Sequence, residues 1–256
     1  MLEPLRDLRY RRDMKRYPEL QELTPERHIR MVQEIFSTVT GRYDFLTHLL
    51  SLWRDVWWRR FAVKKLQGRK PRRLLDVATG TADLAIEMAL RNPGCSVVAM
   101  DLMAEMMALG TGKVRSRDLS SRVPFVRADA LHMPFPSGTF DAAAIAFGIR
   151  NIPEKDKALR EMCRVTAPGG RVLVLEMTRP GHGFFQRLYT FYLERIMPLA
   201  ARIFSPNPAA YRYLADSILH FPSPSEFSGM MRKAGLGPVE AYPLTLGITH
   251  LFVGRK

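Results

Sequence analysis

The feature that most constrains the fold is the alternation of short apolar runs with helix-length segments between residues 73 and 177. The runs have the length and composition of buried strands, and apolar residues recur at helical spacing between several of them. The expected strands are residues 73–78, 96–101, 123–128, 140–146 and 171–177, and the expected helices are 82–90, 104–114 and 154–166. Because parallel strands need crossover connections, this pattern predicts a mostly parallel, Rossmann-like α/β sheet.

The segments on either side of this core extend the prediction. Apolar residues recur at helical spacing before the first strand, so residues 28–70 are expected to form a helical cap, entered by a helix that begins at Thr24 and Pro25. Residues 183–220 are expected to form a helical insertion on the acceptor side of the sheet. A last helix, 224–234, and two strands, 239–244 and 248–254, follow, and the C-terminal strand is expected to be antiparallel. Residues 1–27 read as a flexible charged arm, which leaves 28–256 as one domain.

The turn after the first strand predicts a bound nucleoside. Gly80, within residues 74–83, lets a ligand approach the backbone closely. A dinucleotide-binding turn has a second glycine where this chain has Ala82, and Asp76 and Asp83 add negative charge that repels a pyrophosphate. These carboxylates suit a ligand with an ammonium and a sulfonium group. S-adenosyl-L-methionine carries both.

Acidic residues also follow the next two strands. Asp101, next to Leu102, stands 21 residues after Gly80, where a carboxylate can accept hydrogen bonds from both ribose hydroxyls. Asp129, before Ala130, can accept from the adenine amino group. The alternative is that Asp76 and Asp129 only cap helices or turns. Three acids at successive strand ends, with a glycine turn beside them, favour the cofactor.

The end of the fourth strand predicts the acceptor site. Enzymes that methylate amino groups of DNA or glutamine carry an Asn/Asp-Pro-Pro-Tyr-like tetrad there, whereas this chain has Arg150 and Asn151. A cation and an amide at this edge can hold a phenolate or quinol oxygen, which makes the adjacent ring carbon nucleophilic. An ordinary salt bridge of Arg150 is the alternative. Arg150 acting through a water, Tyr43 and Asp44 are candidates for the base that removes the ring proton.

Two segments indicate an apolar substrate and a charged surface. Residues 183–204 are rich in aromatic side chains, which can line an isoprenoid groove or simply pack in the core. Residues 54–73 hold nine basic side chains and one acid beside three tryptophans, which suits either an anionic membrane surface or a solvated helix face.

The composition sets limits on function and location. The net charge of +14 favours an anionic partner, but no nucleic-acid module is recognisable. Two separated cysteines and scattered histidines predict neither a disulfide scaffold nor a metal site. With no signal peptide and no membrane span, a cytoplasmic protein is expected, with peripheral contact at the inner face of the cell membrane left open. The oligomeric state is not predicted.

From about His28 to the C-terminus the sequence resembles the quinone-biosynthesis C-methyltransferases, which belong to the class I S-adenosylmethionine-dependent methyltransferases. The shared motifs are Tyr43-Asp44 with Leu50-Ser51, residues 75–81, residues 146–151, residues 168–171 and residues 211–218. The resemblance implies that Thr81, Asp101, Asp129, Ala130 and Ala146 contact the cofactor and that Arg150 and Asn151 bind the acceptor.

The implied activity is C-methylation of a prenylated quinol, with demethylmenaquinol as the first candidate. Open alternatives are a benzoquinol of ubiquinone biosynthesis, an O- or N-methyltransferase of secondary metabolism, and a catalytically silent subunit of a quinone-synthesis assembly. The chain departs from the family pattern at Ala82 (usually Gly), Thr47-His48 (Asn-Asp), Asp216 (Glu) and Ala146 (often Ser). Ala82 is expected to tighten the methionine pocket slightly.

Overall fold

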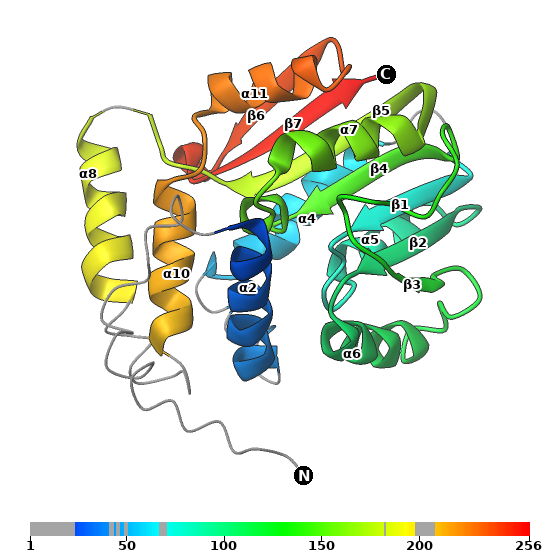
Figure 1. Ribbon diagram of the computed structural model, residues 1–256, viewed down its shortest axis with the longest axis horizontal. Helices are drawn as coiled ribbons and strands as arrows, with labels where there is room; N and C mark the ends of the chain where they lie inside the picture. The colour runs from blue at the N-terminus through cyan, green and yellow to red at the C-terminus, as the bar shows by residue number, and fades with distance from the viewer. Residues whose placement is uncertain are drawn as a thin grey trace.

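A computed structural model describes residues 24–40, 44, 47–48, 51–66, 71–181, 183–197 and 208–256. Its centre is a seven-stranded sheet of order β3-β2-β1-β4-β5-β7-β6, in which β7 alone runs antiparallel to its neighbours (Figure 1). The strands are β1 Arg73–Val77, β2 Ser96–Asp101, β3 Phe125–Arg127, β4 Phe140–Ala146, β5 Thr166–Met177, β6 Val239–Leu244 and β7 Thr249–Arg255. The predicted fold class is confirmed.

The strand order places a ligand-binding crevice at the centre of the sheet. Strand β1 pairs with β2 on one side and with β4 on the other, so that Val77 faces both Met100 and Ile145. The chain moves outward in opposite directions from this point, and ligands of open α/β sheets bind outside the carboxyl ends of the strands where the order reverses.

Helices cover both faces of the sheet. Helices α4 (Arg54–Lys64) and α5 (Asp83–Arg91) pack on one face, and α7 (Lys155–Val165) and α11 (Pro224–Lys233) pack on the other, with α6 (Ala104–Arg115) beside β2 and β3. The strands are nearly continuous apolar runs because both faces are buried: residues 74–77 of β1 are all buried.

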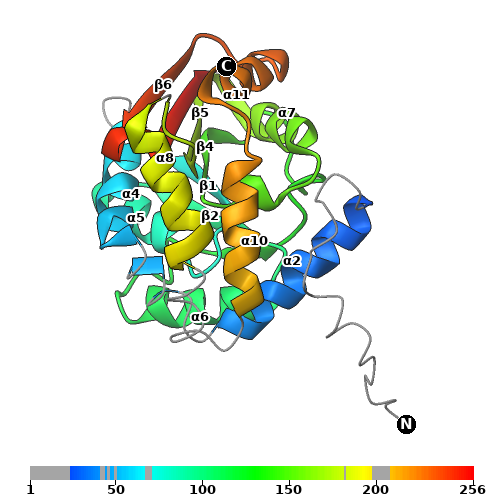
Figure 2. The ribbon, with the colours of Figure 1, turned by 90° about the vertical axis from the view of Figure 1, so that its left-hand side faces the viewer.

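A third group of helices stands at the carboxyl ends of the parallel strands. It comprises α2 (Pro25–Val39), α8 (Phe184–Phe191), the π-helical turn η3 (Tyr192–Ile196) and α10 (Pro208–Leu219), which Figure 2 shows in front of the sheet. Thr24 begins α2 as predicted, since its hydroxyl accepts a hydrogen bond from the Arg27 amide. We call this group, together with Asp44, the cap, and its apolar core includes Met31, Leu193 and Ile218. Helix α4, which the sequence places in the cap, packs on the sheet instead.

Two strands begin two or more residues away from their predicted start. Strand β5 begins at Thr166, because Phe140 pairs with Thr166 while Ala142 pairs with Arg171, so the expected turn at residues 167–170 is a bulge inside the strand. Strand β3 begins only at Phe125. The preceding Pro124 has no amide hydrogen to donate to the ladder.

Candidate active site

The turn between β1 and α5 has an unusual backbone. Gly80 has a φ of +55°, and its amide donates to Asp101 Oδ2 at 2.7 Å. Ala78 and Ala82 also have left-handed backbones, with φ of +51° and +65°, a conformation that costs a residue with a side chain about 1–2 kcal/mol. A Cβ added at Gly110 of α6 would lie 3.2 Å from the Ala82 Cβ. Gly110 therefore leaves room for the methyl group that replaces the usual glycine.

Asp76 lies beneath this turn. Its carboxylate is fully buried and accepts hydrogen bonds from the Thr79 hydroxyl at 2.6 Å and from the Ala85 amide at 3.0 Å. Burial raises the pKa of Asp76 to about 7, against these hydrogen bonds. Because Ala85 lies in the first turn of α5, Asp76 does cap this helix, and it also lines the cavity beside the turn.

The acids after β2 and β3 hold their own loops. Asp101 accepts from the amides of Gly80 and Met103, and burial raises the pKa of its carboxyl group. Asp129 is less enclosed and accepts from the Leu131 amide at 2.9 Å. Asp129 thus makes the turn contact of the alternative considered from the sequence, and both Asp101 and Asp129 also line the same cavity.

This cofactor cavity gathers all eight residues predicted to bind the cofactor. They are Asp76, Gly80, Thr81, Asp101, Leu102, Asp129, Ala130 and Ala146. Arg59 is the one cationic side chain among the described lining residues, and it is paired with acids. Carboxylates stand at three strand ends around the Gly80 turn, where a ligand can approach the backbone closely. This arrangement fits a ligand with hydroxyl, amino and sulfonium groups, so the residues present fit S-adenosylmethionine.

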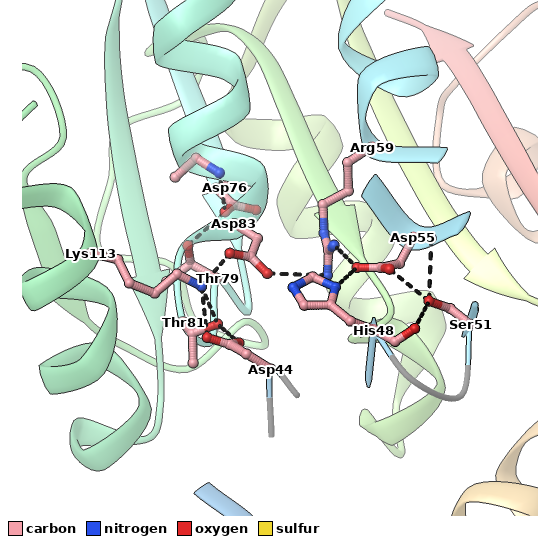
Figure 3. Close-up of polar contacts among 11 residues, drawn as sticks. Asp44, His48, Ser51, Asp55, Arg59, Asp76, Thr79, Thr81, Asp83 and Lys113 are labelled. Carbon is pink, nitrogen blue, oxygen red and sulfur yellow. Dashed lines mark hydrogen bonds and ion pairs between the residues drawn. The ribbon is translucent and has the colours of Figure 1, made fainter. Parts of the chain in front are cut away.

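A polar cluster ties the cap to the cofactor turn (Figure 3). Asp44 of the cap accepts hydrogen bonds from the Thr81 hydroxyl at 2.6 Å and from Lys113 Nζ at 2.9 Å. The same ammonium group of Lys113, on α6, also forms a short contact with Asp83. Asp44, a candidate base, is therefore ion-paired with Lys113 and hydrogen-bonded to Thr81, which lines the cofactor cavity.

A second cluster surrounds Asp55 on α4. Its carboxylate contacts Arg59, the Ser51 hydroxyl at 2.6 Å and His48 Nδ1 at 2.8 Å. Burial opposes ionisation of Asp55, but these hydrogen bonds outweigh burial and its pKa is lowered. Arg59 extends to Asp83, 3.6 Å away, so the two clusters in Figure 3 are joined.

An apolar cavity of about 590 Å³ lies beyond the cofactor cavity, between the sheet edge and the cap. Its walls come from α2, α4, α8, η3 and α10, and most of the side chains are aliphatic or aromatic. Phe36 and Phe147 line both cavities. Phe147 has a φ of +58°, one of the strained backbone positions that often mark functional sites. We call this space the acceptor cavity.

Arg150 lines the acceptor cavity as half of a buried ion pair. It lies on the 3-10 turn η2 (Ile149–Asn151), and its Nη1 contacts Glu176 Oε1 and the Phe147 carbonyl, both at 2.6 Å. Glu176, at the end of β5, is fully buried. The salt bridge considered from the sequence thus exists, but it lies inside the protein beside the cavity.

Asn151 is oriented by the cap. Its Oδ1 accepts a hydrogen bond from the Tyr213 hydroxyl at 3.0 Å, which leaves the amide nitrogen as a donor in the cofactor cavity. His28 Nε2 lies 3.3 Å from the same hydroxyl. Burial, and then the charge of Lys155, lower the pKa of His28.

Several of these residues could not be assigned from the sequence. The sequence does not mark Glu176 and Lys113 as site residues, because their partners are distant in sequence. Asp55 is not marked because it lies in residues 54–73, which the sequence indicates to be a surface. Arg59 was counted with the basic surface of residues 54–73, yet it is buried. The apolar Ala62 and Val63, three and four residues further along α4, lie on the same buried side of the helix as Arg59. Tyr43 lies outside the described residues.

None of the described helices is long and apolar enough to cross a membrane. Within the same residues, no group of three or more His, Cys, Asp and Glu side chains is arranged to hold a metal ion.

Solved structures share the fold. A methyltransferase from Thermotoga maritima, titled S-adenosylmethionine-dependent and a possible histamine N-methyltransferase, superposes with a TM-score of 0.59 at 20% identity and covers 87% of this chain and 99% of its own. Haemonchus contortus phosphoethanolamine N-methyltransferase 2, solved with S-adenosyl-L-methionine, gives a TM-score of 0.58 at 18% identity, covering 78% of this chain and 52% of its own.

Closer relatives are found by sequence. The Geotalea daltonii protein named ubiquinone/menaquinone biosynthesis C-methyltransferase UbiE is 42% identical over 88% of this chain and 96% of its own length. Demethylmenaquinone methyltransferase of Thermus thermophilus is 44% identical over 87% of this chain and 100% of its own. The family profile described as ubiE/COQ5 methyltransferase matches residues 22–256. The chain therefore belongs to the ubiE/COQ5 methyltransferase family, an S-adenosylmethionine-dependent enzyme family.

Proposed function

We propose that this enzyme methylates a ring carbon of a prenylated quinol, with demethylmenaquinol as the acceptor. The observation that carries the proposal is the acceptor cavity: an apolar space of about 590 Å³ that shares Phe36 and Phe147 with the cofactor cavity and holds Arg150 in its wall. A space of this size and lining suits a fused aromatic ring with the first part of an isoprenoid tail. The names of the relatives point to the same acceptor class.

The cofactor is S-adenosylmethionine, which supplies an electrophilic methyl group when it is bound. Asp101 Oδ2 accepts from the Gly80 amide and Oδ1 from the Met103 amide, and each oxygen offers a further acceptor position to the ribose hydroxyls. Asp129 takes the adenine amino group, and Asp76 and the Gly80 turn hold the methionine end. Thr81, Leu102, Ala130 and Ala146 complete the cavity wall.

The acceptor is activated through its ring oxygen. The Asn151 amide, oriented by Tyr213, donates a hydrogen bond to this oxygen at the boundary of the cofactor cavity. The Arg150 guanidinium, with Glu176 compensating its charge, stabilises negative charge on the oxygen from the acceptor cavity. Charge on the oxygen makes the adjacent ring carbon nucleophilic, and the proton that this carbon loses after methylation passes to a water held by Arg150. Positioning supplies much of the rate in such an in-line transfer.

We also propose that the mouth of the acceptor cavity contacts the cytoplasmic membrane surface. Leu52, Leu188 and Ile196 line this cavity and are nevertheless 78%, 49% and 46% exposed. Arg187, Arg195 and Glu194 are exposed on the same α8–η3 segment, so that cations outnumber acids there. Exposed apolar side chains beside a net positive charge favour an anionic lipid surface, from which a prenylated quinol would reach the cavity directly.

The direct test uses S-adenosylmethionine with a labelled methyl group and demethylmenaquinol in detergent micelles. We expect one label on the ring carbon, located by product mass and fragmentation. Absence of a ring-carbon methyl, together with methylation of a soluble catechol or amine, would reject the quinol and support an O- or N-methyltransferase. A prenylated benzoquinol offered in competition measures the preference between the two quinol classes.

A further inference from the structure

Tyr189 is a buried hydroxyl without a hydrogen-bond partner. Its side chain is 7% exposed, and its Oη is among the few buried polar atoms of the described residues with no protein group to bond. It lies on α8, in the aromatic insertion, and lines the acceptor cavity. Burial raises the pKa of this hydroxyl well above its usual value, and the nearby charge of Arg150 partly opposes the rise. The group is therefore a neutral hydroxyl near the guanidinium.

An unsatisfied hydroxyl in this position is costly to the protein. Buried polar groups nearly always have a partner, and one without a partner loses the hydrogen bonds that water gave it in the unfolded chain. A phenylalanine would fill the same space without that loss. The ring of Tyr189 already packs against Tyr192, with centroids 6.4 Å apart, so packing does not require the hydroxyl.

We propose that the Tyr189 hydroxyl donates a hydrogen bond to a ring oxygen of the acceptor and so selects an oxygenated ring within the apolar cavity. The inference rests on the proposed function, because it assigns the missing partner to the quinol. The Tyr189 hydroxyl offers the ring a hydrogen bond, whereas the apolar side chains of α8 offer only packing contacts. A hydrocarbon of the same shape leaves it unpaired, and a site built to bond a hydroxyl discriminates strongly against an analogue that lacks one.

The experiment compares wild type with Tyr189→Phe in binding, turnover and stability. Binding of a naphthoquinol with a short prenyl tail is followed by tryptophan fluorescence, to which Trp58 in the wall of the same cavity contributes. We expect Tyr189→Phe to weaken quinol binding and kcat/KM by about 10- to 100-fold. Its cofactor affinity stays unchanged. Its Tm without ligands stays equal or rises by up to about 3 °C, since an unpaired buried group is removed.

Tyr242→Phe is the matched control, because Tyr242 is a partly buried tyrosine on β6 that lines neither cavity. We expect its quinol affinity and turnover to change less than about twofold. Wild-type quinol binding and turnover in Tyr189→Phe overturn the inference, as do equal losses in both variants. If wild type neither binds nor methylates the quinol, the proposed function fails instead, so the two failures are distinguishable.

Discussion

At the scale of single residues, the site is dominated by carboxylates that the fold desolvates. Asp76 and Asp101 are both held by backbone amides, yet burial raises the pKa of each. This opposition of burial and hydrogen bonding is typical of a site that binds a cation or hydroxyl donors. It also makes the charge of Asp76 sensitive to pH near neutrality.

Asp76→Asn tests this sensitivity. The folded protein holds a proton on Asp76 up to about pH 7, whereas the unfolded chain releases it near pH 4. The stability contribution of the protonated Asp76 is therefore fully present below pH 4 and is lost as pH rises to about 7. We expect the unfolding free energy of wild type, relative to the variant, to fall by about 1.4 kcal/mol per pH unit in this window. Urea unfolding at pH 5, 6, 7 and 8 measures it; a difference that does not vary with pH contradicts the assignment.

Asp101→Ala tests the cofactor assignment. Removing the carboxylate removes the proposed ribose contact and two loop hydrogen bonds, so we expect no detectable cofactor binding in calorimetry. Asp101→Asn retains one acceptor oxygen and should keep the turn folded with weakened binding. Wild-type affinity in the alanine variant would show that the carboxylate faces something other than the cofactor.

The Arg150–Glu176 pair separates catalysis from stability. Arg150→Ala should retain cofactor affinity and lose turnover, because Arg150 lines the acceptor cavity rather than the cofactor cavity. Glu176→Gln leaves the buried guanidinium without its compensating charge, and we expect it to lower the unfolding free energy by about 3–5 kcal/mol. Calorimetry, turnover and urea unfolding are measured on both variants. Unchanged turnover in Arg150→Ala would reduce Arg150 to a structural ion pair.

At the scale of elements, the parts that the sequence predicts are those encoded within a short stretch of chain. Strand ends, the Gly80 turn and the Asp101 spacing belong to one βαβ unit, so local pattern is sufficient. The Asp44–Lys113 contact joins positions 69 residues apart, and no local pattern encodes such a pair. The burial of Arg59 was missed for a related reason: α4 carries basic and apolar residues around most of its surface, so its buried side is set by the sheet beneath it.

A double-mutant cycle on Asp44 and Lys113 tests whether α6 holds the cap over the cofactor turn. The pair is only partly buried, so we expect a coupling of about 0.5–1 kcal/mol between Asp44→Ala and Lys113→Met in cofactor binding. Higher salt should reduce it. Arg115→Met, at the exposed end of the same helix, serves as the control and should leave affinity unchanged. If the effects of Asp44→Ala and Lys113→Met on the free energy of cofactor binding are strictly additive, the contact does not contribute to cofactor binding.

At the scale of the whole molecule, charge and apolar exposure meet at the mouth of the acceptor cavity. In the proposed membrane contact, the net charge of +14 would draw the protein toward an anionic surface. The exposed Leu52, Leu188 and Ile196 would then set which face of the protein meets the lipid.

Vesicle binding measures this orientation. We expect Leu188→Ser combined with Ile196→Ser to reduce partitioning onto anionic lipid vesicles about tenfold, since two exposed apolar contacts are lost. The control is Leu90→Ser combined with Leu109→Ser, whose side chains are 51% and 41% exposed but do not line the cavity. Equal loss in both double variants would indicate non-specific adhesion.

Phe147, which belongs to the walls of both cavities, has a thermodynamic consequence. Any rearrangement of its ring that one ligand induces alters the space open to the other, so the two affinities are linked. Such linkage is reciprocal: if bound quinol raises the affinity for S-adenosylmethionine by some factor, bound S-adenosylmethionine raises the affinity for quinol by the same factor. The dissociation constant of each ligand, measured with and without the other, should therefore change by the same factor. A smaller side chain at position 147 should bring this factor toward one.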